Sequence, residues 1–356
     1  MNIAFFGSSL VSAYWNGAAT YYRGLLSALH ARGHSIVFYE PDAFERQSHR
    51  DIPDPDFARV VVYENDPGAM RRALGSAKSA DLIVKASGVG VFDAELEAGV
   101  LELKTARNHV VFWDVDAPAT LERMEAHAGD PFHALVPRFD GVFTYGGGLP
   151  VQEAYRNLGA RFCEPIYNAL DPRTHFPGQR DERFGGDLGF LGNRLPDREA
   201  RVREFFLEVA ARLPEKQFVL GGSGWDSHIE LPHNVRSVGH VYTRDHNAFN
   251  SSPRAVLNIA RDSMARFGFS PATRVFEAAG GAACLISDYW QGIEQFFEPN
   301  EEILVARNGQ GVAALLEDLS EERAFQIGQA ALKRALSGHL YEHRAARVED
   351  VLEGRI

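Results

Sequence analysis

Short hydrophobic runs alternate along the chain with longer stretches in which apolar residues repeat at helical spacing. The first run, NIAFFG, is separated by a loop from the helical stretch TYYRGLLSALHAR. In that stretch Leu25, Leu26 and Leu29 share one face. Gly33 stands where a helix-ending glycine is expected, before the next run, SIVFYE. This order predicts a strand, a helix and a second, parallel strand.

The same alternation continues through the chain. Further apolar runs in the first half are ARVVVYE, ADLIVKA, HVVFWDVD, DGVFTYG and ARFCEPIY. After a stretch rich in Pro, Gly and charge, the second half repeats the scheme with LGFLGN, QFVLGGSG, VRSVGHV, AVLNIA, ACLIS and EILVA. Continuous apolar runs between helical stretches are typical of a parallel sheet that helices cover on both faces.

We therefore predict an α/β protein with two doubly wound, Rossmann-like domains that face a cleft. The predicted boundaries are 1–170 for the N-terminal domain, 171–187 for a linker, 188–335 for the C-terminal domain and 336–356 for a helix that packs back toward the N-terminal domain. Ligands of such folds bind at the carboxyl ends of the strands. The loops that follow strands are therefore the places to look for function.

Charge, cysteine content and the length of the apolar runs indicate which partners and which cellular compartment to expect. The formal net charge of -11 and the lack of a dense basic block disfavour nucleic acid as a partner. Cys163 and Cys284 lie far apart in sequence among small or apolar residues, as expected of reduced, buried thiols. The N-terminus has no basic leader, and no run approaches the roughly 18 apolar residues of a membrane span. We expect a cytoplasmic protein without a transmembrane segment.

One segment, SPATRVFEAAGGAACLISDYW, combines charge with a helix start. Ser270 is a typical N-cap residue, so we predict that the helix begins there. Arg274 and Glu277 are three residues apart and share a face near the positive end of the helix dipole. An anion such as a diphosphate suits the free N–H groups and the guanidinium, and a carboxylate one turn later suits ribose hydroxyls. An exposed ion pair would give the same pattern.

Together with this segment, several motifs in a fixed order resemble those of a known enzyme family. They are GSSLVSAYWNGAATYYRGL, FWDVDAPATL, TYGGGLPVQEAYRNLGA, GFLGNRLPDREARV, GSGW, NVRSVGHV, RVFEAAGGAACLISD and HLYEHRAARVEDVL. The chain resembles group 1 glycosyltransferases of the GT-B architecture and, more narrowly, the subset named after the spore maturation protein CgeB. The resemblance implies transfer of a sugar from a nucleotide-diphosphate sugar to a hydroxyl-type acceptor. It also implies retention of the anomeric configuration. We expect no cofactor, and we predict metal independence because the second half, with Arg274, supplies the positive charge that a cation would.

The resemblance also implies roles on the donor side. Glu277 would bind the ribose, and Arg274 would bind the diphosphate and act in catalysis. Many relatives carry a second glutamate near the transferred sugar, where this chain has Phe269 or, in another alignment, Ala265. This departure leaves the sugar open. The other donor-side candidates follow strands of the second half and are Arg194, Ser223, Trp225, His240, Val241 and Asp288.

Acceptor-side candidates come from loops of the first half. They are Ser8, Asn16, Gly17, Arg23, Trp113, Asp116, Tyr145, Gly146 and Gly147. Asp114 ends a strand, where a carboxylate could orient an acceptor hydroxyl or act as a base. A carboxylate at this point could equally cap the following helix. We select Asp114 as the catalytic carboxylate.

Other patterns favour different functions less well. The DVD sequence at 114–116 matches a metal-binding signature of the other large glycosyltransferase fold, but Arg274 supplies the charge that a cation would. Asp93 replaces the third glycine of a dinucleotide fingerprint, which disfavours a dehydrogenase. His339 and His343 are four residues apart but have no third ligand nearby in sequence. A sugar-nucleotide 2-epimerase and a non-catalytic nucleotide-binding scaffold stay open, as does the acceptor: a glycan, a lipid-linked glycan, a small molecule or a protein.

Overall fold

The computed structural model describes residues 1–14, 16–225 and 229–355. The chain divides into two compact units. The first contains Met1–Asn168 together with the C-terminal segment from Tyr341 on, and the second contains Ala169–Leu340. Within the described residues, no helix is both long enough and apolar enough to cross a membrane.

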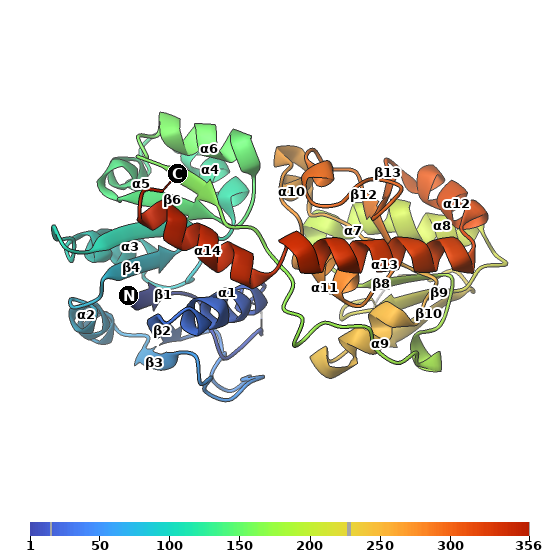
Figure 1. The fold of residues 1–356 in the computed structure, drawn as a ribbon, viewed down its shortest axis with the longest axis horizontal. Helices are drawn as coiled ribbons and strands as arrows, with labels where there is room; N and C mark the ends of the chain where they lie inside the picture. Colours follow the sequence, from blue (N-terminus) through green and yellow to red (C-terminus); the bar gives the residue numbers. More distant parts are fainter. Residues whose placement is uncertain (15, 226–228, 356) are drawn as a thin grey trace. The chain divides into compact units, whose positions relative to one another are not determined.

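A parallel sheet of seven strands forms the centre of the first unit, with the order β3-β2-β1-β4-β5-β6-β7 (Figure 1). The strands are β1 (Asn2–Phe6), β2 (Ser35–Asp42), β3 (Arg59–Glu64), β4 (Leu82–Ala86), β5 (His109–Asp114), β6 (Gly141–Thr144) and β7 (Cys163–Pro165). Every residue of the central strand β4 is buried, including the charged Lys85. The strand order reverses between β1 and β4, which makes the sheet doubly wound.

The strands of the first unit are connected by helices, and the C-terminal helix packs onto the same unit. These helices are α1 (Ala19–Ala31), α2 (Pro67–Ser76), α3 (Asp93–Leu101), α4 (Ala117–Ala126), α5 (Phe132–Leu135), α6 (Gly148–Asn157) and α14 (Tyr341–Leu352). The Glu349 carboxylate on α14 accepts from Arg32 Nη2 at 2.5 Å and lies 2.8 Å from His34 Nε2. Helix α14 therefore returns to the first unit, as predicted.

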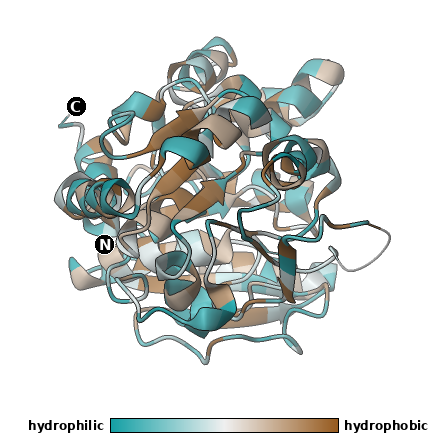
Figure 2. Cartoon of the chain, turned by 90° about the vertical axis from the view of Figure 1, so that its right-hand side faces the viewer, coloured by the Kyte–Doolittle hydropathy of each residue, from teal (hydrophilic) through white to brown (hydrophobic). Residues whose placement is uncertain are grey.

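A six-stranded parallel sheet, ordered β10-β9-β8-β11-β12-β13, forms the centre of the second unit. Its strands are β8 (Leu188–Leu191), β9 (Phe218–Gly221), β10 (Val235–Gly239), β11 (Ala255–Asn258), β12 (Leu285–Asp288) and β13 (Leu304–Ala306). The order again reverses, here between β8 and β11. Hydrophobic residues gather on these strands and hydrophilic residues on the outer helices (Figure 2).

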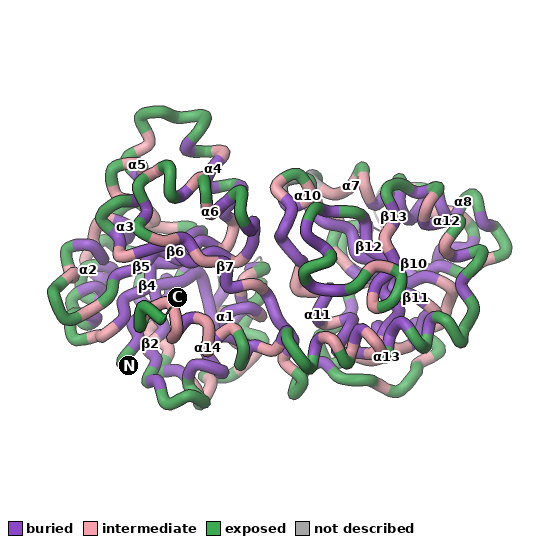
Figure 3. The backbone as a smooth tube through the Cα atoms, turned by 45° about the horizontal axis from the view of Figure 1, so that its top comes forward, coloured by how far each residue is buried: buried purple, intermediate pink, exposed green. Residues whose placement is uncertain are grey.

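The helices of the second unit complete a second Rossmann-like layer structure. They are α7 (Pro196–Val202), α8 (Glu208–Arg212), α9 (His246–Ser251), α10 (Asp262–Phe267), α11 (Thr273–Gly280), α12 (Gly309–Asp318) and α13 (Glu321–Gly338). A π-helical turn, Arg203–Leu207, joins α7 to α8. In Figure 3, where buried residues are purple, the strands of both units are largely purple, and exposed residues are concentrated in the loops and outer helices. The predicted α/β class with two doubly wound units is confirmed.

Candidate functional site

Helix α11 begins later than the sequence predicts. Its first residue is Thr273, and the extended N-cap residue Ala272 provides no side-chain hydrogen bond. The predicted N-cap at Ser270 is wrong, because the Ser270 hydroxyl donates to Gly268 O at 2.9 Å. Phe269, just before it, has a φ of +47°, which turns the chain ahead of the helix. The first N–H groups of α11 therefore have no side-chain cap.

Arg274 lies in the first turn of α11, three residues before Glu277. Among the described residues, its partly buried guanidinium makes no hydrogen bond and no ion pair. Burial lowers the pKa of Arg274, and the nearby charge of Glu277 opposes that shift. An arginine in a protein nevertheless stays protonated. A guanidinium next to an uncapped helix N-terminus is suited to bind an anion.

Glu277 lies one turn further along α11 and has two histidine neighbours from distant parts of the sequence. His175 Nε2 lies 3.7 Å from Glu277 Oε1, and both side chains are largely buried. One potential ligand atom each from His175, His246 and Glu277 lies within 4.8 Å of the other two. Sequence reasoning missed both histidines: His175 lies in the predicted linker, and no spacing pattern connects it to His246 or Glu277.

The glycine pair at the end of α11 explains how the histidines reach Glu277. A Cβ on Gly280 would lie 2.9 Å from His175 O, so the absent side chain lets the His175 segment approach the helix. Gly281 O accepts from Ser251 Oγ at 3.2 Å, which fixes the C-terminal end of α9. His246 is the first residue of α9. Adjacent glycines thus position the two segments that carry the histidines.

Two glycine loops that follow strands β8 and β9 meet, as the sequence predicts for strand-end loops, but their side chains are already engaged. Trp225 Nε1 donates to Gly192 O at 2.7 Å, and the indole is buried. Ser223 O accepts from Arg194 N at 2.9 Å. Arg194 forms a bidentate pair with Glu199, at 2.8 and 3.0 Å. Its charge is therefore balanced inside the protein.

The other donor-side candidates differ in accessibility. His240 is exposed and meets the Tyr242 ring edge-on at 4.7 Å, whereas Val241 is buried. The Asp288 side chain is fully buried and pairs with Arg201 Nη2 at 2.6 Å. Burial raises the pKa of Asp288, and Arg201 opposes the shift. The geometry gives Asp288 a structural role at the end of β12 and does not expose it to a donor.

The corresponding carboxylate of the first unit, Asp114, is also inaccessible. The hydroxyl of Ser87 donates to its Oδ1 at 2.7 Å and that of Thr120 at 3.1 Å, while Tyr155 donates to Oδ2. Asp116 N also donates to Oδ1, at 3.1 Å. Burial raises the pKa of Asp114, against these hydrogen bonds. The expectation that Asp114 contacts an acceptor is therefore not supported, because both oxygens are engaged and the residue has no exposed surface.

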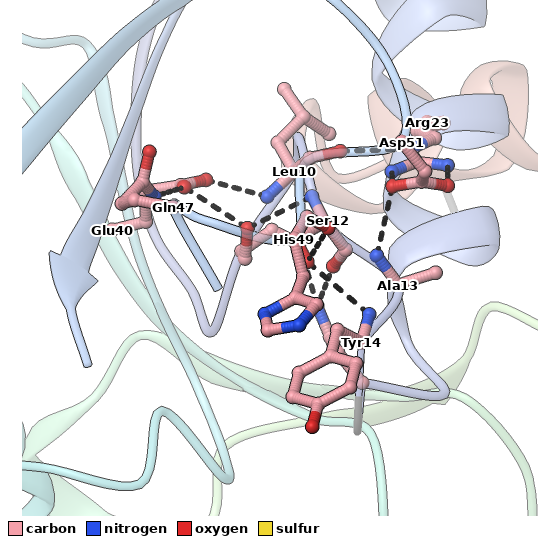
Figure 4. Close-up of polar contacts among 11 residues, drawn as sticks. Leu10, Ser12, Ala13, Tyr14, Arg23, Glu40, Gln47, His49 and Asp51 are labelled. Atoms are coloured by element: carbon pink, nitrogen blue, oxygen red, sulfur yellow. Dashed lines mark hydrogen bonds and ion pairs between the residues drawn. The ribbon is translucent and has the colours of Figure 1, made fainter. Parts of the chain in front are cut away.

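The loop after β1 is organised by its own polar network (Figure 4). The guanidinium of Arg23 holds both Asp51 oxygens, at 2.9 and 2.7 Å, and Leu10 O accepts from Arg23 Nε. Ser8 Oγ donates to Asn16 Oδ1 at 2.9 Å, deep in the loop. Of the four candidates here, only Gly17 is exposed. Ser8, Asn16 and Arg23 shape this loop and offer no open donor group to an acceptor in this structure.

The remaining acceptor-side candidates cluster at the ends of β5 and β6. Trp113 is buried and donates to the Tyr21 hydroxyl at 3.0 Å. Asp116 is partly exposed, and Tyr145 packs edge-on against the Tyr21 ring at 5.4 Å. Gly147 is the N-cap of α6 with a φ of +96°, and a Cβ there would come within 2.0 Å of a Val151 methyl. Gly148 also has a positive φ, so the turn favours glycine at 147 and 148, and Gly146 is buried beside them.

Two patterns that the sequence offered for other functions have structural explanations. Asp93 accepts from the Val89 and Gly90 N–H groups and pairs with Lys85 Nζ at 2.7 Å. His339 is buried in the second unit, with its ring 5.6 Å from that of Phe276. Asp93 therefore closes a loop, and His339 belongs to the core of the second unit.

Comparisons with known proteins agree with this architecture. Residues 198–350 match a family model described as "Glycosyl transferase-like". No curated protein sequence matches the chain. Anabaena HepE in complex with UDP and glucose is similar in structure, with a TM-score of 0.69, 15% identity, and coverage of 99% of this chain and 100% of that chain.

Two further solved structures are similar over the same length. Sucrose-phosphate synthase from Thermosynechococcus elongatus has a TM-score of 0.69 and 14% identity, covering 99% of this chain and 98% of that chain. An alpha-glucosyltransferase in complex with UDP and a 13-mer DNA containing an HMU base has a TM-score of 0.70 and 12% identity, covering 99% of each chain. The fold is therefore that of the GT-B glycosyltransferases. The domain match and the fold are those of a glycosyltransferase enzyme.

Proposed function

We propose that this protein transfers a sugar from a UDP-sugar to a hydroxyl-type acceptor. The observation that carries the proposal is the partly buried Arg274, which has no hydrogen bond or ion pair among the described residues and lies at the uncapped start of α11. A diphosphate satisfies both the guanidinium and the first N–H groups of the helix. The uridine nucleotide is chosen because HepE was solved with UDP-glucose and the alpha-glucosyltransferase with UDP.

Glu277 and Arg274 have separate tasks in this proposal. Glu277, one turn from Arg274, accepts hydrogen bonds from the ribose hydroxyls. Arg274 and the helix N-terminus stabilise the negative charge that develops on the departing UDP, which is the main catalytic effect expected here. Because these groups supply the positive charge, the proposed transfer needs no metal. Retention of configuration is part of the proposal, and the motifs quoted above support the CgeB-like subset.

The position of the family's second glutamate bears on the transferred sugar. Phe269 is buried, and its N–H donates to Gln291 O at 2.6 Å. A Cβ on Gly292 would overlap the Phe269 ring, so the ring fills this turn. We propose that the sugar is held by neutral groups at this point, without the carboxylate that many relatives use.

The compartment and the acceptor belong to the same proposal. Cys163 and Cys284 are free and buried, and burial raises the pKa of Cys284 to about 12. Two protected thiols suit a reducing cytoplasm. The net charge of -11 favours a glycan, a lipid-linked glycan, a small molecule or a protein as the acceptor over a nucleic acid.

Calorimetric titration of UDP into the full chain, with chelator present, tests the donor site. We expect UDP to bind, and Glu277→Gln to weaken binding at least about tenfold, or about 1.4 kcal/mol. Glu317→Gln, on the exposed surface of α12, is the matched control and should bind as the parent does. A folded chain that binds no nucleotide would contradict the proposal. Donor hydrolysis that stops on chelation would contradict only its metal independence.

A further inference from the structure

A buried ring nitrogen of His175 faces the carboxylate of Glu277. The Thr174 hydroxyl directs its single proton to Asp171 O, at 3.1 Å, so its oxygen accepts from His175 Nδ1–H at 2.9 Å. In the neutral ring, this tautomer has no proton on Nε2. Nε2 is buried, has no hydrogen-bond partner among the described residues, and lies 3.7 Å from Glu277 Oε1. Either a proton on Nε2 or a metal ion bound by both atoms would make this contact favourable.

His246 supplies a third donor atom to the same point. Its Nε2 donates to Val241 O at 3.3 Å, which leaves the lone pair on Nδ1. A metal-ligating histidine commonly donates its other ring N–H to a carbonyl or another acceptor in this way.

The two histidine segments are fixed to each other before any ligand binds. Asn247 Nδ2 donates to Thr174 O at 2.9 Å, and Phe176 N donates to Asn247 Oδ1. Gly178 N donates to Ser251 Oγ at 3.0 Å. The segment that carries His175 is therefore bound to α9 by three hydrogen bonds, which lowers the entropy cost of bringing the donor atoms together.

From this geometry we propose that His175, His246 and Glu277 form a binding site for a transition-metal dication of the Zn²⁺ type. Two imidazoles and a carboxylate are a known donor set for zinc, whereas Mg²⁺ and Ca²⁺ prefer oxygen ligands alone. Tetrahedral bonds of about 2.0–2.1 Å place ligand atoms about 3.4 Å apart, so the three atoms, now within 4.8 Å, must converge by about 1.4 Å or less. Water would complete the coordination.

The metal blocks the donor substrate, a consequence that rests on the proposed function. A Glu277 carboxylate bound to a metal cannot accept hydrogen bonds from ribose hydroxyls. Arg274 stands three residues before Glu277 on α11, and its positive charge opposes a dication at the site. The site is therefore weaker than a structural zinc site, and Zn²⁺ acts as a reversible inhibitor that competes with UDP-sugar.

Cobalt binding to the untagged full chain tests the site without any assay of activity. We expect one Co²⁺ per chain, with the visible absorption of a four-coordinate ion. His175→Ala, His246→Ala and Glu277→Gln should each weaken binding at least about tenfold, and Arg274→Ala should strengthen it. His343→Ala, an exposed histidine on α14, should change nothing. Binding that none of the three ligand substitutions weakens, or no binding by the folded chain, would overturn the site.

A competition experiment separates this inference from the proposed function. UDP should displace Co²⁺ from the parent chain, and His175→Ala should lose cobalt while still binding UDP within a few-fold of the parent. If cobalt binds through the three ligands but UDP does not bind, the donor proposal fails and the metal site stands. If UDP binds and cobalt does not, His175 and Glu277 form a protonated ion pair and the metal site is wrong. Simultaneous binding of both would refute the competition.

Discussion

The ring of Tyr341 occupies the place where a side chain on Gly24 would stand. A Cβ at Gly24 would lie 2.2 Å from Tyr341 Cε2, so the two helices α1 and α14 approach through the missing side chain. Both residues are buried within the first unit. Segments more than 300 residues apart in sequence thus share one contact.

Filling this contact should destabilise the first unit. Gly24→Val is expected to lower the free energy of unfolding by about 2 kcal/mol, because an overpacked core has to shift a rigid ring or a helix. Urea denaturation followed by far-UV circular dichroism measures the loss. Gly17→Ala is the control, since a Cβ there meets nothing within 4 Å. Equal stability of Gly24→Val and the parent would show that α14 does not need this close approach.

The sequence predicts the sheets better than the contacts between distant segments. Continuous apolar runs such as β9 need no partner to be recognised, because burial on both faces shows in every residue. The start of α11 was mispredicted because local capping preferences favoured Ser270, whereas the φ of +47° at Phe269 redirects the chain. A strained residue next to a glycine loop leaves no signature in the propensities of its neighbours.

The stabilising effect of Asp93 should depend on the presence of Lys85. Lys85 is fully buried, and its ammonium lies 2.7 Å from Asp93 Oδ1. Asp93→Ala leaves the ammonium unpaired and should cost about 3 kcal/mol. Lys85→Met should lower the free energy of unfolding by less than that. When Lys85→Met is already present, adding Asp93→Ala should remove only the stability that comes from the two hydrogen bonds of Asp93 to the loop. A double-mutant cycle in urea measures the coupling, and additive losses would contradict it.

Glu97 should make the stability of the first unit fall with rising pH. Burial raises the pKa of Glu97 from 4.5 to about 7, and Lys85 opposes the shift. Between these two values the folded chain binds more protons than the unfolded chain, so the free energy of unfolding decreases as pH rises from about 4.5 to 7. A raised carboxyl pKa of this size corresponds to about 3 kcal/mol.

Replacing Glu97 isolates its part of the pH dependence. The stability of Glu97→Gln relative to the parent should rise by about 3 kcal/mol across this window and then level off above pH 7. Urea titrations at half-unit pH steps give the difference curve. The control is Glu95→Gln, because Glu95 lies on the exposed side of α3, two residues before Glu97; this variant should give a flat curve. A flat curve for Glu97→Gln as well would show that the carboxyl ionises freely in the folded chain.

The candidate site contains one pair of residues that the sequence can place together and another pair that it cannot. Arg274 and Glu277 can be placed together from sequence because three residues separate them on one helix. His175 and His246 cannot, because their positions depend on two segments that pack against the end of α11. From sequence, Gly280 and Gly281 could be interpreted only as the end of a helix, because the residues that pack beside a glycine depend on the tertiary structure.

Gly280 gives the sharpest test of that arrangement. A Cβ there would come within 2.4 Å of Leu170 Cδ1 and 2.9 Å of His175 O, and the second of these atoms belongs to backbone that yields little. Gly280→Val should therefore push the His175 segment away from Glu277, cost about 2 kcal/mol of stability, and weaken cobalt binding at least about tenfold while UDP binding stays within a few-fold of the parent. Calorimetry on the folded variant measures the two affinities, with Gly338→Ala as the control, because a Cβ there has no neighbour within 4 Å. Parent-like affinity for both ligands in Gly280→Val would show that the packing of this segment against α11 does not position the site.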